Sequence, residues 1–306
     1  MRKRFQLSEF LTREEVCDPE LAAAAARSLG PLPPAPFPVR GIHASKERGS
    51  SLEFSEHTKY VAGDDLRSLD WKVYAKSDRY FVKRFEDERL SRVVLMVDAS
   101  GSMAYGGREG PCGSKYHLAA RVAAALASAL IRQGDAVGIY LAGDSPFFLS
   151  PRGGKAQLDS VISLLMMRAP SGEAFIGKAL DELAERLKKP STLILISDLL
   201  DDEGGIFRGL SSLKSRGVEP RVIQIVHPDE ISLPFESSTR FVDLEGPGFL
   251  VADPEALRRA YFEEMKAFIS GIRALASESG MKYALVRDGA EAAQTFPALM
   301  GRTGAL

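Results

Sequence analysis

The chain has 306 residues, of which 45% are hydrophobic and 26% are charged, the ordinary balance of a globular protein with ample apolar material for a core. Its formal net charge of -1 excludes a protein that binds nucleic acid or an anionic membrane through bulk basicity. Its two cysteines stand in no paired-spacing motif, and its longest apolar stretch, residues 118–131, is shorter than the roughly 18 residues of a membrane span, so we expect a cytoplasmic protein with no membrane span and no nucleic-acid partner.

The first part of the chain has the pattern of an extension. Residues 1–30 are predicted to be helical, because they end in an alanine run at 22–26. Five prolines then forbid a continuing helix and indicate an extended linker: Pro31, Pro33, Pro34, Pro36 and Pro38. Residues 40–90 are polar and irregular, with one expected strand at Arg79–Phe85.

From Arg92 the pattern changes to that of a buried sheet. The run Arg92–Asp98 (RVVLMVD) is rich in β-branched residues, does not alternate with polar residues and is bounded by serine and glycine. These features are typical of a central parallel strand that is covered on both faces. A glycine-rich loop at 101–113 follows, and a helix is expected from about Lys115 to Arg132.

Strands and helices alternate over the rest of the chain. The further strands are expected at Ala136–Leu141, Thr192–Asp198, Arg221–His227 and Lys282–Val286, with Phe147–Leu149 returning as an antiparallel edge strand. Helices are expected at roughly 155–167, 176–188 and 204–216. The last long helix is the best marked, because Asp253 can cap it, Pro254 occupies its first turn and Gly280 ends it.

This alternation predicts an α/β fold with a doubly wound, mostly parallel sheet that has helices on both faces. We expect two parts. Residues 1–90 hold the N-terminal helix, the proline-rich linker and a GDD-R-DW region, and residues 91–306 form the α/β domain.

Polar side chains follow two of the expected strands. Residues 98–102 (DASGS) follow the first strand, and Ser197 and Asp198 end the Thr192 strand. In open α/β sheets ligands bind beyond the carboxyl ends of the strands, and a tight turn lets the hydroxyls of Ser100 and Ser102 face one point with Asp98 behind them. Carboxylate and hydroxyl oxygens suit Mg²⁺ or another hard divalent cation. We therefore predict a cation site formed by Asp98, Ser100, Ser102 and Asp198.

The same residues resemble a known family. DASGSM at 98–103 matches the DxSxS signature of von Willebrand factor A domains, and ISD at 196–198 matches the later aspartate of that site. The resemblance implies a metal-ion-dependent adhesion-type site, in which Ser100 and Ser102 bind the cation directly and Asp98 and Asp198 hold it largely through water. Such a cation can accept a carboxylate from a partner protein.

The family's third loop supplies a threonine in a pattern like GGTxxGxAL, and GEAFIGKAL at 172–180 has Ala174 at that position, with Glu173 beside it.

A wider resemblance covers roughly residues 40–290. YVAGDDLRSLDW at 60–71, FVKRFEDE at 81–88 and HPDE at 227–230 resemble a bacterial family of unknown function numbered 58, whose members carry a von Willebrand factor A-like domain and are often encoded beside MoxR-type AAA+ ATPases. The resemblance implies a non-enzymatic interaction module that works with a MoxR-type ATPase on a client protein. The residues alone favour a structural turn at 63–67, in which aspartates bond turn amides and Arg67 pairs with one of them.

An enzymatic alternative is a phosphohydrolase of the haloacid-dehalogenase kind, with Asp98 as the nucleophile. That chemistry requires an acid two residues later to protonate the leaving group, and this position is Ser100. A nucleotide-binding role has less support, because Gly110–Lys115 has the wrong spacing for a phosphate loop. The sequence therefore favours the interaction module.

Overall fold

A computed structural model describes residues 10–29, 53–59, 73, 80–86, 91–107 and 110–300. The chain divides into two compact units, residues 34–90 and residues 1–33 together with 91–306. The predicted turn at 63–67 and the proline-rich linker lie outside the described residues. Within those residues, no helix combines the length and the apolar character that a bilayer crossing needs.

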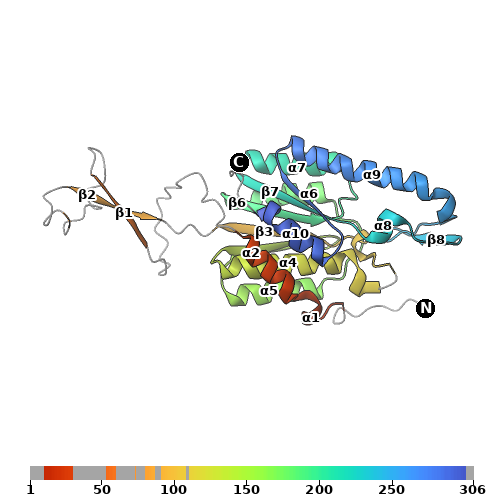
Figure 1. Cartoon of the computed structure of the whole chain (residues 1–306), viewed down its shortest axis with the longest axis horizontal. Coiled ribbons are helices and arrows are strands. Elements are labelled where there is room, and N and C mark those ends of the chain that lie inside the picture. The colour runs from red at the N-terminus through yellow and green to blue at the C-terminus, as the bar shows by residue number, and fades with distance from the viewer. Residues whose placement is uncertain are drawn as a thin grey trace. The chain divides into compact units, whose positions relative to one another are not determined.

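The larger unit is built on a six-stranded sheet (Figure 1) of order β10-β7-β6-β3-β4-β5. Its strands are β3 (Arg92–Asp98), β4 (Ala136–Ala142), β5 (Phe147–Arg152), β6 (Ser191–Ser197), β7 (Val218–Ile225) and β10 (Lys282–Val286). All neighbouring strands are parallel except β4 and β5, which are antiparallel. The doubly wound, mostly parallel fold and its antiparallel edge strand are therefore confirmed.

Strand β3 shows why the apolar run folds in this way. Successive side chains of a strand point to opposite faces of the sheet. Val93, Leu95 and Val97 belong to the core on one face, and Val94 and Met96 belong to the core on the other. All five are fully buried, so a strand without polar alternation is what a sheet covered on both faces requires.

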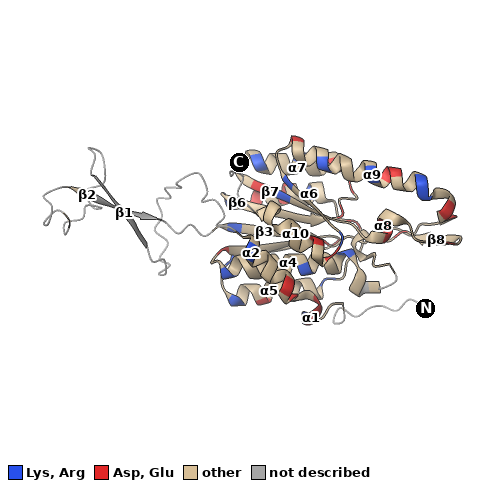
Figure 2. Ribbon diagram, viewed as in Figure 1, with Lys and Arg blue, Asp and Glu red and all other residues tan. Residues whose placement is uncertain are grey.

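Helices cover both faces of this sheet. One core packs α1 (Arg13–Val16), α2 (Pro19–Ser28), α4 (Lys115–Arg132), α5 (Lys155–Met167) and α10 (Gly289–Met300). The other core packs α6 (Ile176–Arg186), α7 (Glu203–Ser215) and α9 (Pro254–Glu278). Charges of both signs are spread along α9 (Figure 2), while Ile272 and Ala276 on its inner side are fully buried.

The N-terminal helical region is two helices rather than one. Asp18 caps α2 by accepting from the backbone N–H groups of Glu20 and Leu21, and Pro19 occupies the first turn, which proline favours. Helix α2 packs against α4 and α10, and Leu21 and Ala25 are buried in the core. The predicted boundary between residues 90 and 91 would put α1 and α2 in a different part from residues 91–306. In the structure these helices pack within the same compact unit as residues 91–306.

Two short antiparallel pairs complete the described structure. Strand β2 (Phe81–Glu86), close to the strand expected at Arg79–Phe85, pairs with β1 (Glu53–Lys59) in the smaller unit. In the larger unit, β8 (Thr239–Val242) pairs with β9 (Phe249–Ala252) between the short helix α8 (Pro228–Ser232) and α9. The sequence pattern does not predict strands β1, β8 and β9, because none of them has the long apolar run of a central strand. Strand β1 has seven mostly polar residues (EFSEHTK), and β8 and β9 have four residues each.

Candidate functional site

The predicted site lies where the strand order reverses. From β3 the chain moves to β4 and β5 on one side, and β6 and β7 follow on the other side of β3. Strands β3 and β6 are parallel neighbours, so their carboxyl ends meet at one edge. Asp98 ends β3, and Asp198 directly follows β6. This reversal is where open α/β sheets bind ligands.

The two predicted hydroxyls face each other. The Oγ atoms of Ser100 and Ser102 are 2.9 Å apart. Asp98 shapes the turn, because its Oδ1 accepts the backbone N–H of Ser100 at 2.8 Å. A single turn of 3-10 helix, Ser102–Ala104, follows at once. The local sequence thus forms the tight turn that brings both hydroxyls to one point.

The two predicted carboxylates are buried and already have protein partners. Asp98 and Asp198 are each only 3% exposed. Oδ2 of Asp98 accepts the hydroxyl of Ser197 at 2.6 Å. In Asp198, Oδ1 accepts the backbone N–H of Leu200 at 3.1 Å and Oδ2 accepts the ammonium of Lys115 at 2.8 Å. Each of the four carboxylate oxygens therefore already accepts a hydrogen bond from the protein.

The surroundings of Asp98 disfavour its charged form. Burial, and next the negative charge of Asp198, raise the pKa of Asp98 from 3.8 to about 7, although hydrogen bonds from Ser197 and Ser100 act in the opposite direction. A raised carboxyl pKa means that the charged form lacks sufficient compensation. A cation held at the neighbouring hydroxyls would supply that compensation, and carboxylate and hydroxyl oxygens are the donors that a hard divalent ion prefers.

Lys115 is a site residue that the sequence analysis missed. Its side chain is 1% exposed, and its ammonium bridges Asp198 at 2.8 Å and Glu230 at 2.5 Å. Burial lowers the pKa of this ammonium, but the two carboxylates outweigh burial and leave the pKa raised. A signal existed in the sequence, because Lys115 directly follows the helix cap Ser114, and a cation at a helix N-terminus is unfavourable unless acids compensate it.

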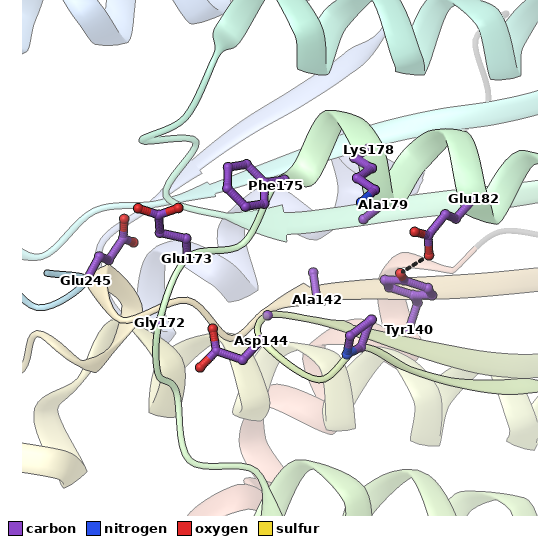
Figure 3. Close-up of a pocket in the computed structure, with 12 residues that line it drawn as sticks. Tyr140, Ala142, Asp144, Gly172, Glu173, Phe175, Lys178, Ala179, Glu182 and Glu245 are labelled. Carbon is purple, nitrogen blue, oxygen red and sulfur yellow. Dashed lines mark hydrogen bonds between the residues drawn. The ribbon is translucent and has the colours of Figure 1, made fainter.

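The third loop of the expected site lies beside the turn. The backbone N–H of Gly101 donates to the carbonyl of Gly172 at 2.7 Å, and that of Ser171 donates to the carbonyl of Ala99 at 3.0 Å. Ala174 is half-buried and offers no hydroxyl. Exposed Glu173 lines a neighbouring pocket of about 470 Å³ (Figure 3). This loop therefore lacks the threonine ligand that the resemblance implies.

Any metal site here depends on the hydroxyls. In the part of the chain that the structure describes, no group of three or more His, Cys, Asp or Glu side chains could hold a metal ion. Such groups form both transition-metal sites and carboxylate sites for Mg²⁺ or Ca²⁺. The assignment of Asp98, Ser100, Ser102 and Asp198 to a cation therefore stays a prediction that rests on the Ser100–Ser102 pair.

Comparison with known proteins adds a family. A family model described as "Protein of unknown function DUF58" matches residues 56–270. The uncharacterized proteins Rv1480 of Mycobacterium tuberculosis (strain ATCC 25618 / H37Rv) and Mb1516 of Mycobacterium bovis are each 27% identical over 229 residues, which cover 73% of this chain and 71% of theirs.

Solved structures are similar at lower identity. The conserved hypothetical protein BatB from Bacteroides thetaiotaomicron is 19% identical, with a TM-score of 0.47, over 68% of this chain and 95% of its own. The SpRpn10 VWA domain is 15% identical, with a TM-score of 0.43, over 71% of this chain and all of its own (100%).

Proposed function

The chain belongs to the DUF58 family of proteins of unknown function, and from this premise we propose that it is a non-enzymatic protein-interaction module that binds a partner's carboxylate through a divalent cation. The observation that carries the proposal is the pair of hydroxyls on Ser100 and Ser102, 2.9 Å apart at the reversal of strand order. Two neutral hydroxyl oxygens meet there, and Asp98 and Asp198 are buried at the ends of the neighbouring strands β3 and β6.

The proposed roles follow from charge. Ser100 and Ser102 would hold the cation directly, and Asp98 and Asp198 would face it from behind. When bound, the cation supplies a positive charge that attracts an anionic side chain. The serine hydroxyls bring no negative charge of their own, and the ammonium of Lys115 neutralises Asp198. Both features leave positive charge on the cation for a partner's acid.

The alternative, a phosphohydrolase with Asp98 as nucleophile, has less support from the geometry. The carboxylate is 3% exposed, and its oxygens accept hydrogen bonds from Ser100 and Ser197, so they are poorly placed to attack a phosphate ester. The position for the general acid is Ser100, whose hydroxyl does not protonate a leaving group near neutral pH. Turnover of generic phosphate esters that Asp98→Asn abolishes would favour this alternative.

The proposed partner comes from the family resemblance. Because family members are often encoded beside MoxR-type AAA+ ATPases, we assign a MoxR-type ATPase as the partner, with a client protein on which the two act. A direct test is co-purification of the chain with the neighbouring ATPase in ATP, in ADP and without nucleotide, each with Mg²⁺ or with EDTA.

We expect the ATPase to be retained in at least one nucleotide state, and we expect EDTA to release it. The Ser100→Ala, Ser102→Ala double variant should fail to retain it even with Mg²⁺, because the cation's direct ligands are gone. Failure to bind in every nucleotide state would contradict the partner assignment. Binding that neither EDTA nor the double variant changes would contradict the role of the cation.

A further inference from the structure

The loop between β8 and β9 reaches the turn that follows β3. The backbone N–H of Ser102 donates to Oε1 of Glu245 at 3.2 Å, a contact between residues 143 positions apart. The loop has a defined shape, because Oδ1 of Asp243 accepts the N–H of Glu245 at 2.9 Å and the N–H of Asp243 donates to the carbonyl of Gly248 at 2.9 Å. Glu245 is half-buried, while Asp243 and Leu244 are exposed.

Gly101 makes room for this loop. A Cβ atom on Gly101 would lie 2.2 Å from the carbonyl oxygen of Leu244 and 3.1 Å from Cγ of Glu245. The backbone of Gly101 has φ -59° and ψ -36°, a right-handed helical conformation that any residue adopts. Backbone geometry therefore does not require glycine here. The close approach of residues 244 and 245 does.

The pocket that Glu245 lines has mostly acidic charged residues. Of the residues that line the pocket in Figure 3, four are acidic and one, Lys178, is basic; the acids are Asp144, Glu173, Glu182 and Glu245. Figure 3 shows the side chains of Glu173 and Glu245 at the same end of this pocket. A cation bound by Glu245 would offset part of this negative charge.

We propose that Glu245 is the cation site's own carboxylate ligand, which binds the cation in the free protein and leaves when a partner's carboxylate takes its place. The inference rests on the proposed function and deepens it. Glu245 carries the same functional group as the partner residue, and it touches the turn that presents the hydroxyls. It also supplies an oxygen at a site where Ala174 has none. In this proposal the β8–β9 loop lies over the cation site, and a partner must displace the loop in order to bind the cation.

The test is Mn²⁺ titration calorimetry on the whole chain, with Glu245→Ala, Gly101→Ala and the control Glu263→Ala. We expect Glu245→Ala to weaken Mn²⁺ binding by roughly 10- to 100-fold, the range typical of residues that support a metal site. Gly101→Ala should weaken binding similarly, because its methyl group displaces the loop while its backbone conformation stays allowed. Glu263 is exposed on α9, so its removal tests the effect of one lost surface charge.

Amide hydrogen exchange tests the contact itself. We expect faster exchange in residues 243–248 of the Gly101→Ala variant and unchanged exchange in the central sheet, which shows that the fold is intact. Equal Mn²⁺ affinity in wild type and Glu245→Ala would overturn this inference alone. If Glu263→Ala weakened Mn²⁺ binding as much as Glu245→Ala does, the inference would also be overturned, since the loss of one surface charge would then explain the effect. A wild type that binds no Mn²⁺ would overturn the proposed function together with this inference.

Discussion

Replacement of Lys115 by methionine is expected to lower the free energy of unfolding by about 3–5 kcal/mol, the typical loss when one partner of a buried ion pair is removed. The ammonium of Lys115 is 1% exposed, and the carboxylates that it bridges are 3% exposed in Asp198 and 17% in Glu230. Methionine keeps an unbranched chain of similar length, so the variant removes the charge with little change in packing. Without the ammonium, the buried Asp198 and the half-buried Glu230 have no cation between them.

Urea unfolding at neutral pH measures this loss. Lys266→Met is the matched control, because Lys266 is exposed on α9, and surface substitutions of this kind change stability by less than about 0.5 kcal/mol. The additional change Glu230→Gln should recover part of the loss, since it removes one of the unpaired charges. A loss below about 1 kcal/mol in Lys115→Met would contradict a stabilising role for this ion pair.

Asp98→Asn is expected to stabilise the metal-free protein at pH 8 and to leave it nearly unchanged at pH 4. The pKa of Asp98 is raised from 3.8 to about 7 by burial and by Asp198, so the folded protein binds this proton more tightly than the unfolded chain does. Stability from this group is therefore fully present below pH 4 and is lost as the pH rises through 7. At about 1.4 kcal/mol for each pKa unit, the free energy of unfolding falls by at most about 4 kcal/mol as Asp98 ionises. Asparagine does not ionise, so it removes this loss.

Urea unfolding in EDTA at several values between pH 4 and pH 8 gives the comparison. Wild type should lose stability across this interval more steeply than Asp98→Asn does. Asp181→Asn, at an exposed position of α6, should follow the wild-type curve. Parallel curves for wild type and Asp98→Asn would show that Asp98 has no uncompensated charge in the folded protein.

The core of the fold could be predicted because burial leaves a local pattern. Strand β3 has the bounds expected for it, Arg92–Asp98, since a strand covered on both faces must be apolar throughout. Burial does not account for the β8–β9 pair. Phe249, Leu250 and Val251 are consecutive apolar residues that are each about 60% exposed, and their strand exists because β8 lies beside it.

The candidate site could be predicted in part for a related reason. The carboxyl ends of parallel strands meet at one edge of a sheet, so the sequence pattern was enough to associate Asp98 with Asp198. Lys115 and Glu245 could not be associated with the site in this way, because neither follows a strand of the central sheet: Lys115 begins α4, and Glu245 lies between β8 and β9. The position of Lys115 at a helix N-terminus was a usable signal. For Glu245 the local sequence carries none, since the loop's approach depends on Gly101 and on the pairing of two short strands.

The central claim is that Ser100 and Ser102 hold a divalent cation. Titration calorimetry with Mg²⁺ and with Mn²⁺, on wild type and on the Ser100→Ala, Ser102→Ala double variant, tests it most directly. We predict saturable binding of one cation per chain in wild type and loss of that binding in the double variant, with both proteins equally folded by circular dichroism. Identical titrations of the two proteins, whether both bind or neither does, would contradict the claim.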